Sequence, residues 1–473
     1  MQICFPSVLA ALVVIPCFAA NIQTEDLFFF STHKNPTQVV SDSKNAFVLT
    51  EGGVLVYDYR RQAWIDNLVP GGSIQAIRYS SRRSRFYVMA QGRILEYNGA
   101  FRRLTNASQE DFNQADDAGE APSLDGLTMD GDYFFLGGSI RDKYMRRALV
   151  NQARLFEYDN LWILTQGLGP FFGSSRRKQA RSLWFGLDDP AATVIYPEGK
   201  NIWFGSCRAG GAVVKAGKDL NSWRVFPSGL EFGFTNGCVY DVASWKNFIW
   251  LATESGVVRQ DPRTGRFQAY SHLQGGTDLR VNCLLVHQGR LYGGSEEGVS
   301  YLADPKEEFQ SLQLPGSIRV PVYALESKDG DLWAATQYGL YVYNAGAWKT
   351  LKDFFGRDIP ESYGTFLPSV LYHDSTLYWI NGDRVMFKPG HGAAKVLLTR
   401  DRAARLRWDG DMLYVAFYSG VTAYNTANGL WTDFRLEDGI PGTTVRCFNV
   451  FDGKLWIGAD AGVTRITLKP YLP

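Results

Sequence analysis

Residues 443–468 read TTVRCFNVFDGKLWIGADAGVTRITL, and this stretch decides the fold. Residues 445–451 are an apolar run rich in branched and aromatic side chains, which is typical of a β-strand. The Asp452-Gly453 pair suits a two-residue hairpin, because both central positions of such a turn need a positive φ. Residues 455–457 return as a second strand, and residues 463–466 read as a third. Three short antiparallel strands cannot bury both faces of their sheet, so the stretch must pack against similar units.

Copies of this unit recur through most of the chain. Further copies begin, in chain order, at Ala46, Arg85, Asp132, Asn201, Phe248, Arg290, Asp331, Thr376 and Met412. Several copies place a small residue four positions before a glycine, as in Ala252 and Gly256, which lets neighbouring sheets approach closely. An aromatic residue such as Trp162 or Trp431 marks a fourth strand in most units. Four strands in roughly 40–47 residues predict an all-β fold, a β-propeller of four-stranded blades with about ten repeats.

The two ends of the chain are predicted to meet. The tenth unit has only three strands, while residues 24–31 (TEDLFFFS) form an apolar strand ahead of the first unit. This N-terminal strand is expected to close the last blade, so that no strand edge stays open. No Pro/Gly/Ser-rich linker divides residues 21–473. We therefore prefer a single ring for this span, with two fused rings as the alternative.

Residues 1–20 (MQICFPSVLAALVVIPCFAA) have the character of a secretory signal peptide. Their apolar core, residues 8–15, is too short to span a bilayer, and small residues precede the expected cleavage site. No other segment reaches the ~20 apolar residues of a transmembrane helix, so no integral membrane segment is expected after cleavage. The predicted location is extracytoplasmic, either periplasmic or secreted. A net charge of +1 favours neither nucleic acid nor an anionic membrane as a partner.

Four cysteines remain after removal of the signal peptide: Cys207, Cys238, Cys283 and Cys447. Four cysteines in a chain of this length do not form a disulfide scaffold. Buried free thiols are the simpler interpretation. A bridge between Cys207 and Cys238, which lie in neighbouring repeats, is the alternative in an oxidising compartment.

The C-terminal units resemble a known family of repeats. Residues 434–446 (FRLEDGIPGTTVR), followed by residues 453–463 (GKLWIGADAGV), are similar to the repeat of two-component-regulator propellers. Those propellers are extracytoplasmic sensor domains of some bacterial histidine kinases. The resemblance implies a sensor-like propeller, without a kinase in this chain.

Long irregular segments are predicted to gather on one rim of the propeller. Residues 108–123, 139–152, 166–182 and 351–366 each join strand four of a unit to the next unit, or strand two to strand three. Both kinds of connection lie at the same end of the blades. Because long loops on a rigid scaffold commonly carry binding residues, this rim near units three and four is the expected functional surface.

The candidate ligand-binding residues of that rim and of the central channel are arginines and phenylalanines. They are Arg141, Arg146, Arg147, Phe171, Phe172, Arg176, Arg177, Arg280, Arg319 and Arg446. The arginines suit a carboxylate, sulfate or phosphate ligand, although pairing with the neighbouring acidic loop is the simpler interpretation. That loop supplies weak Ca²⁺ candidates in Asp111, Asp116 and Asp117, whose spacing matches no known calcium loop. No other cofactor is expected.

The sequence carries no HExxH, GxSxG, P-loop or CxxC motif, and its histidines are scattered singly. We therefore predict a secreted or periplasmic, non-catalytic binding propeller that contacts a protein, peptide or glycan through one loop-rich rim. The alternative is a propeller lyase or hydrolase acting on a polysaccharide or peptide, because propeller enzymes assemble their sites from separate blades.

Overall fold

The computed structural model describes residues 17–19, 22–23, 26–68, 74–98, 103–115, 119–131, 133–142, 147–207, 212–227, 237–270, 280–315, 319–356 and 367–472. Their strands form ten sheets, most of them four-stranded and antiparallel, with two short helices, α1 (Gln109–Gln114) and α2 (Leu351–Phe355). The all-β propeller fold predicted from the repeats is confirmed.

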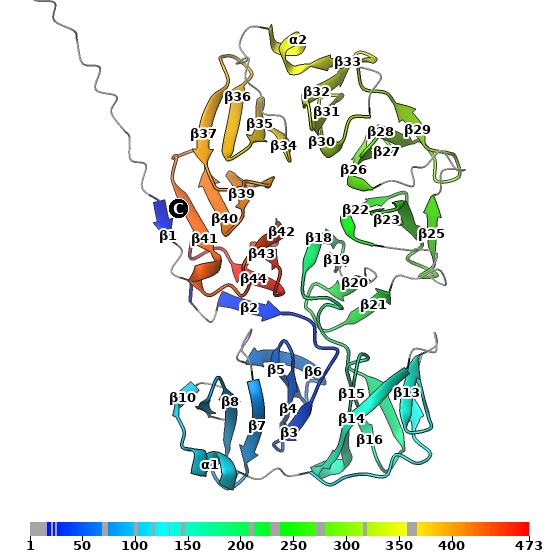
Figure 1. Ribbon diagram of the computed structural model, residues 1–473, viewed down its shortest axis with the longest axis vertical. Coiled ribbons are helices and arrows are strands. Elements are labelled where there is room, and N and C mark those ends of the chain that lie inside the picture. Colours follow the sequence, from blue (N-terminus) through cyan, green and yellow to red (C-terminus); the bar gives the residue numbers. More distant parts are fainter. Residues whose placement is uncertain are drawn as a thin grey trace, which may run out of the picture.

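The first three sheets lie side by side, with the first sheet between the second and the third (Figure 1). They contain β3 (Gln38–Ser41), β4 (Asn45–Thr50), β5 (Gly53–Asp58) and β6 (Ala63–Leu68); β7 (Ile74–Ser80), β8 (Arg85–Ala90), β9 (Arg93–Tyr97) and β10 (Arg103–Asn106); and β11 (Thr128–Met129), β12 (Tyr133–Leu136), β13 (Ser139–Asp142), β14 (Arg147–Phe156), β15 (Asn160–Thr165), β16 (Pro170–Ser174) and β17 (Gln179–Ser182). We call them the three-sheet part.

The other seven sheets follow the same up-and-down order. Those before the last two contain β18 (Ala192–Glu198), β19 (Asn201–Ser206), β20 (Ala212–Gly217) and β21 (Trp223–Pro227); β22 (Val239–Trp245), β23 (Phe248–Thr253), β24 (Gly256–Gln260) and β25 (Phe267–Tyr270); β26 (Val281–His287), β27 (Arg290–Ser295), β28 (Gly298–Leu302) and β29 (Gln310–Leu312); β30 (Val322–Lys328), β31 (Asp331–Thr336), β32 (Gly339–Asn344) and β33 (Ala347–Thr350); and β34 (Val370–His373), β35 (Thr376–Asn381), β36 (Arg384–Pro389) and β37 (Lys395–Thr399). The last two contain β38 (Arg405–Asp409), β39 (Met412–Phe417), β40 (Gly420–Asn425) and β41 (Trp431–Arg435), beside β1 (Cys17–Ala19); and β42 (Val445–Phe451), β43 (Lys454–Ala459) and β44 (Val463–Thr467), beside β2 (Leu27–Phe30).

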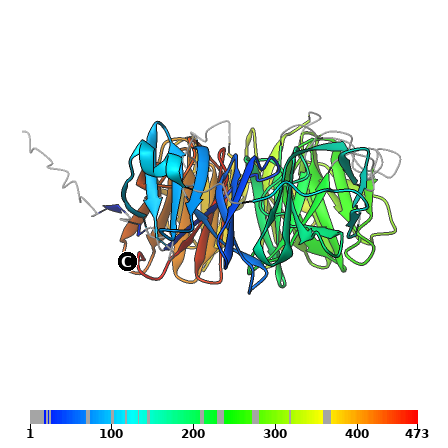
Figure 2. The same ribbon diagram turned by 90° about the horizontal axis from the view of Figure 1, so that it is seen from below.

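These seven sheets close a ring (Figure 1). Each first strand contacts the first strand of the next sheet, from β18 through β22, β26, β30, β34, β38 and β42, and β42 contacts β18 again. The three-sheet part lies beside this ring, and all sheets share one flat layer (Figure 2). The arrangement therefore differs from the preferred single ring of ten sheets. The closing contact explains the difference, because Cys447 Sγ donates to the Ala192 carbonyl at 3.3 Å and Asn449 donates to the Ile195 carbonyl at 2.8 Å.

Five blades of the ring each bury a tryptophan, and two of the junctions between blades place a small residue against the next sheet. Tryptophans on the second strands of five ring sheets are at most 1% exposed: Trp203, Trp250, Trp333, Trp379 and Trp456. A Cβ added to Gly294 would lie 2.7 Å from Val322 Cγ1 of the next sheet, and one added to Gly458 would lie 3.2 Å from Ala192 Cβ. Close approach through small residues, as the repeat predicted, is confirmed at these two junctions.

The N-terminal strand closes the last blade, as predicted. Strand β2 pairs antiparallel with β44, with Leu27 opposite Ile466 and Phe30 opposite Val463. Ser31 then donates to the Ala461 carbonyl at 2.6 Å. The four-stranded order β2-β44-β43-β42 leaves β44 without an open edge.

The third sheet differs from the sequence interpretation. Its four blade strands are β14, β15, β16 and β17, so Trp162 lies on the second strand and not on the fourth. Residues 166–182 contain β16 and β17 rather than a long connection. Strands β12 and β13 form an added hairpin on the first half of β14. Prediction failed here because the hairpin repeats the apolar alternation of a blade strand.

The insertions of the three-sheet part cover its open faces. Helix α1 packs Phe112 and Ala115 against Tyr87 and Ile94 of the second sheet. The added hairpin packs Ile140 into a cluster with residues of β15 and β16. An open stack of sheets exposes the outer face of its first and last member, and apolar surface there needs a cover. These segments are therefore structural covers.

One apolar cluster joins the three-sheet part to the ring. It contains Val48 and Tyr57 of the first sheet, Trp162 of the third, and Phe204 and Trp456 of the ring. Phe30, the last residue of β2, and Phe185, between β17 and β18, lie in the same cluster, with ring centroids 6.4 Å apart.

His33 lies in this joint as a neutral imidazole. It is 1% exposed, and burial lowers its pKa from 6.5 to about 3. Its Nδ1 lies 2.6 Å from Thr50 Oγ1, and its Nε2 accepts the Ser31 amide at 3.4 Å. An Nε2 acceptor implies the Nδ1–H tautomer. Protonation of Nε2 would remove that acceptor and bury a charge.

We predict that His33 makes the protein less stable in mild acid. Because its folded pKa is depressed, the unfolded chain binds more protons below pH 6.5, so stability is lost as pH falls from 6.5 toward 3. At pH 5 the expected loss is about 2 kcal/mol, from 1.36 kcal/mol per pKa unit. Denaturant titrations at pH 7 and pH 5 measure it. His33→Gln should abolish that share of the pH dependence, whereas His391→Gln, at an exposed position, should not. The same dependence of stability on pH in the wild type and both variants would contradict the prediction.

Candidate functional site

One end of the ring's central channel is lined by two kinds of connection. Successive strands of each sheet are antiparallel. The first strand therefore begins at the same end of the sheet as the turn between the second and third strands. We call this end the mouth rim. Its side chains of interest are Tyr240, Arg280, Tyr323, Tyr338, Arg402 and Tyr418.

β-Bulges reorient residues at the start of the first strands. In five ring sheets the pairing register shifts around one residue of the first strand: Thr193, Tyr240, Asn282, Tyr323 and Arg446. A bulge bends its strand and re-aims the extra side chain. The repeated bulge therefore places variable side chains around the channel mouth, while the paired residues on either side stay in the sheet.

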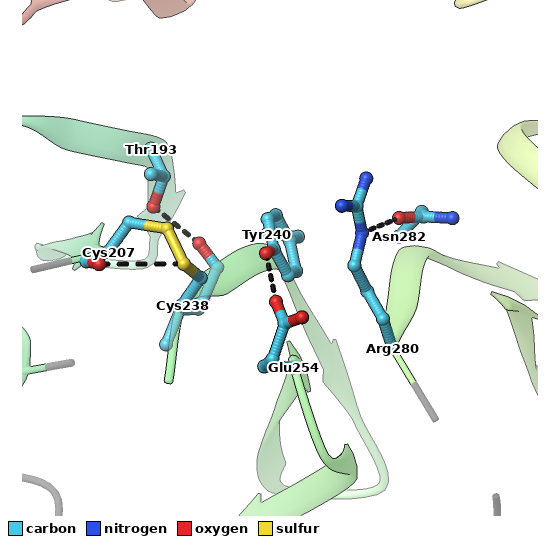
Figure 3. The surroundings of a disulfide bond; sticks show 8 residues. Thr193, Cys207, Cys238, Tyr240, Glu254, Arg280 and Asn282 are labelled. Atoms are coloured by element: carbon cyan, nitrogen blue, oxygen red, sulfur yellow. Dashed lines mark hydrogen bonds between the residues drawn. A yellow bond between two sulfur atoms is a disulfide. The ribbon is translucent and has the colours of Figure 1, made fainter. Parts of the chain in front are cut away.

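Tyr240, Glu254 and Arg280 form a contact group at this mouth (Figure 3). The Tyr240 hydroxyl donates to Glu254 Oε2, and the Arg280 guanidinium lies 4.5 Å from the Tyr240 ring centroid. Burial, and then the Glu254 hydrogen bond, raise the pKa of Tyr240 to about 12. Arg280 also donates to Asn282 at 2.5 Å and lies 3.6 Å from Glu296. The group holds an aromatic ring and a cation in fixed positions.

A disulfide ties two blades beside this group (Figure 3). Cys207 follows β19 and is bonded to Cys238, which precedes β22. The bridge that the sequence left as an alternative is therefore present. Cys283 and Cys447 are buried free thiols, as predicted from the sequence for these two residues.

Two further tyrosines on the mouth rim are exposed. Tyr338, in the turn after β31, is 55% exposed, and Tyr418, in the turn after β39, is 38% exposed. The Arg402 guanidinium lies 4.9 Å from the Tyr418 ring centroid. Tyrosine beside arginine thus occurs twice on this rim, once near Arg280 and once near Arg402.

Inside the ring lies a cavity of about 430 Å³. Residues of the first strands line it, among them Asp241 of β22, Glu326 of β30, and Arg405 and Arg407 of β38. Sequence reasoning missed all four. The signal was the alternation in residues 405–408, RLRW, which turns both arginines to one face of a strand whose Leu406 is buried.

The structure separates the candidates predicted near the third sheet. Phe171 is fully buried against Tyr133, with centroids 5.1 Å apart, so it is a core residue. Arg141 of the added hairpin lies opposite Arg147, the first residue of β14. Arg146 lies outside the described residues.

Three other candidates do come together. Phe172, Arg176 and Arg177 line a surface hollow of about 770 Å³ on the third sheet. The turn between β16 and β17, which holds both arginines, is bound to Asp159: the Arg176 amide donates to its Oδ1 at 2.9 Å. This turn lies at the end of the blade opposite to the predicted rim, because it joins β16 and β17, the third and fourth strands of the blade.

The channel candidates and the acidic loop are largely paired within the protein. Arg319 lies 3.1 Å from Glu297, and Arg446 is exposed on β42. Asp111 forms a capping box with Ser108 at the start of helix α1 and pairs with Arg83. The hydrogen bond from Ser108, and then the one from Arg83, lower the pKa of Asp111. Asp116 and Asp117 lie outside the described residues. Within the part of the chain that is described, no group of three or more His, Cys, Asp or Glu residues could hold a metal ion.

Comparisons with known proteins support the fold. No protein-family model and no curated protein matches the chain. PorZ of Porphyromonas gingivalis, an essential bacterial surface component of the type-IX secretion system, is 13% identical with a TM-score of 0.53 over 92% of this chain and 74% of its own. YCF48 bound to D1 peptide is 14% identical (TM-score 0.46, covering 60% and 95%), and the extracellular domain of the putative hybrid two-component system BT3049 from B. thetaiotaomicron is 13% identical (TM-score 0.28, covering 93% and 76%). At such identities the likeness to PorZ shows the fold alone.

The helices of the described residues are all too short or too polar to cross a membrane.

Proposed function

We propose that the protein is an extracytoplasmic, non-catalytic binding propeller that contacts a protein, peptide or glycan through the mouth rim of its seven-sheet ring. The observation that carries the proposal is the grouping of Tyr240 with Arg280, and of Tyr418 with Arg402, around one channel mouth. Tyrosine and arginine dominate the binding energy of many interfaces, because they combine large apolar contact with hydrogen bonding.

The rim is pre-ordered for binding. The disulfide between Cys207 and Cys238 ties the end of β19 to the start of β22, and Arg280 is held by Asn282 and the Tyr240 ring. Side chains already fixed in place lose less conformational entropy when a ligand arrives. A rigid rim of this kind suits recognition of a defined ligand.

Three observations support an extracytoplasmic location. Residues 1–20 have signal-peptide character, and the disulfide is of a kind that persists in oxidising compartments. PorZ, which shares the fold, is a bacterial surface component. The resemblance of residues 434–463 to two-component-regulator repeats adds a sensor-like role to the proposal.

The proposal is tested by removing an exposed rim tyrosine. A ligand is first selected with the wild-type protein on peptide and glycan arrays and its Kd is then measured. Tyr338→Ser, at a side chain 55% exposed, should weaken binding by roughly 30-fold or more, since a hot-spot residue contributes about 2 kcal/mol. Its matched comparison is Tyr158→Ser, at an exposed tyrosine that lines the hollow of the third sheet, and this variant should leave Kd unchanged if the ligand occupies the rim.

A second pair of variants distinguishes the surfaces. If Arg176→Ala/Arg177→Ala weakens binding and Tyr338→Ser does not, the ligand occupies the hollow of the third sheet instead. Equal Kd values for all variants would refute the rim. Shortened products from the selected glycan or peptide would favour a lyase or hydrolase, for which Asp241 and Glu326 in the channel are the carboxylates to replace first.

A further inference from the structure

The channel holds two arginines that the binding rim does not use. Arg405 and Arg407 are two residues apart on β38, the first strand of its sheet, so both side chains point to the same face. Both line the cavity of about 430 Å³. Arg405 Nη2 reaches across the channel to the Tyr240 carbonyl of β22, a sheet that is not adjacent to its own, at 3.3 Å.

Arg407 also lines the cavity, and in the described part of the chain it has no hydrogen-bond acceptor. A guanidinium offers five N–H donors. Among the described residues, no atom accepts a hydrogen bond from Arg407 and no carboxylate lies within 4.0 Å of it. Burial and the neighbouring Arg405 lower its pKa, while Asp241 and Glu326 oppose that change. Arg407 is only partly buried and borders the open channel, so its donors can reach an acceptor group on a molecule that enters the channel.

The two channel carboxylates are already engaged by the backbone. Asp241 accepts the Val242 amide at its Oδ1 and the Leu284 amide at its Oδ2, both at 2.9 Å. Glu326 accepts the Ser327 amide at 2.8 Å through one oxygen. The cavity therefore holds an excess of donors on β38 and one carboxylate oxygen, Glu326 Oε2, opposite them.

We propose that the channel is a binding site for the oxyanion of a small, hexose-sized molecule, held by Arg405 and Arg407. The shared chemistry is a carboxylate or phosphate group, which matches the planar fork of a guanidinium. A cavity of about 430 Å³ accommodates one sugar-sized ligand.

The acidic residues set the preferred charge of that ligand. Glu326 and Asp241 repel a second negative charge, so a singly charged carboxylate is favoured over a doubly charged phosphate. Glu326 Oε2 remains able to accept a hydroxyl donor of the same ligand. The cavity shares Tyr323 with the mouth rim, but the exposed rim residues Tyr338 and Tyr418 do not line it, so variants at these two tyrosines test the rim alone.

The experiment is calorimetric titration of the full chain, at one ionic strength, with three probes that share one hexose ring. The probes are glucuronate, glucose 6-phosphate and glucose. Glucuronate is expected to bind most tightly, glucose 6-phosphate more weakly, and glucose not measurably. A phosphate that binds more tightly than the carboxylate would assign the oxyanion to a phosphate ligand. No heat from either charged probe, or equal binding of glucose, overturns the proposal.

Variants test the named residues. Arg407→Gln removes the positive charge and shortens the side chain but keeps two N–H donors, and it should weaken glucuronate binding roughly tenfold or more. Arg263→Gln, at an arginine on a distant hairpin whose side chain is 89% exposed, should not. Glu326→Gln should strengthen glucose 6-phosphate binding, a change that a merely structural role would not produce. Tyr338→Ser should leave glucuronate binding intact, so failure of the rim proposal and failure of this one are distinguishable. Unaltered glucuronate affinity in a folded Arg407→Gln protein overturns the assignment.

Discussion

Replacing Phe30 by alanine should lower the free energy of unfolding by about 3–5 kcal/mol, the usual cost of deleting a buried phenylalanine. Phe30 is fully buried on β2, where its ring lies 5.3 Å from Trp223 and 5.5 Å from Phe204, centroid to centroid. It also belongs to the cluster that joins the ring to the three-sheet part. One truncation therefore weakens blade closure and the joint together.

Thermal or denaturant unfolding measures the loss. If the chain unfolds cooperatively, the melting temperature should fall by roughly 3–5 °C, given about 2 cal/mol/K of unfolding entropy per residue. Phe28→Ala is the matched control on the same strand: Phe28 is only partly buried, beneath the Arg465 guanidinium at 4.8 Å, and should cost less. Deleting residues 21–31 should destabilise more than either substitution, and an unchanged melting temperature of the deletion would refute the closing strand.

Replacing Asp433 by alanine should cost about 3–5 kcal/mol, because it leaves an arginine charge unpaired in the interior. Asp433 is 1% exposed on β41. Arg400 Nη2 donates to its Oδ1 at 3.0 Å, and Thr422 donates to the same oxygen at 2.7 Å. The Arg400 side chain is itself only 17% exposed, so water would replace the carboxylate only in part.

Paired variants separate the burial cost from the loss of a contact. Glu437→Ala removes a carboxylate that is 72% exposed and pairs with Arg435, so its effect should stay below about 1 kcal/mol. Arg400→Met combined with Asp433→Ala should recover part of the loss, since no charge then remains unpaired. A double variant as unstable as the sum of the single variants would show that the pair is not coupled.

Several features of the fold were accessible from the sequence because they depend on neighbouring residues. The Asp452-Gly453 turn has positive φ at both residues, 52° and 67°, as a two-residue hairpin requires. The last unit lacked a fourth strand, and an apolar strand at the N-terminus had no partner in its own unit, so the sequence predicted that the two would pair. In the structure β2 pairs with β44. Alternating apolar residues and glycine turns act over a few residues, so a single chain displays them directly.

The third sheet shows where that reasoning fails. Its added hairpin, β12 and β13, carries the same alternation as a blade strand, so the pattern could not distinguish cover from blade. The candidates placed there then separated: Phe171 is core, whereas Phe172, Arg176 and Arg177 share one hollow. A one-strand error in assignment moves a turn to the opposite end of the sheet.

The repeat alone determined that this chain forms four-stranded blades that cover one another, with an N-terminal strand in the last of them. How many blades close the ring was decided by contacts between residues far apart in sequence, such as Cys447 with Ala192, 255 positions away. The channel was decided in the same way, since Arg405 and Arg407 meet Asp241 and Glu326 only when β38, β22 and β30 surround one axis. Local patterns encode which face of a strand is buried, whereas ring closure depends on how sheets pack side by side, and packing has no signature in neighbouring residues.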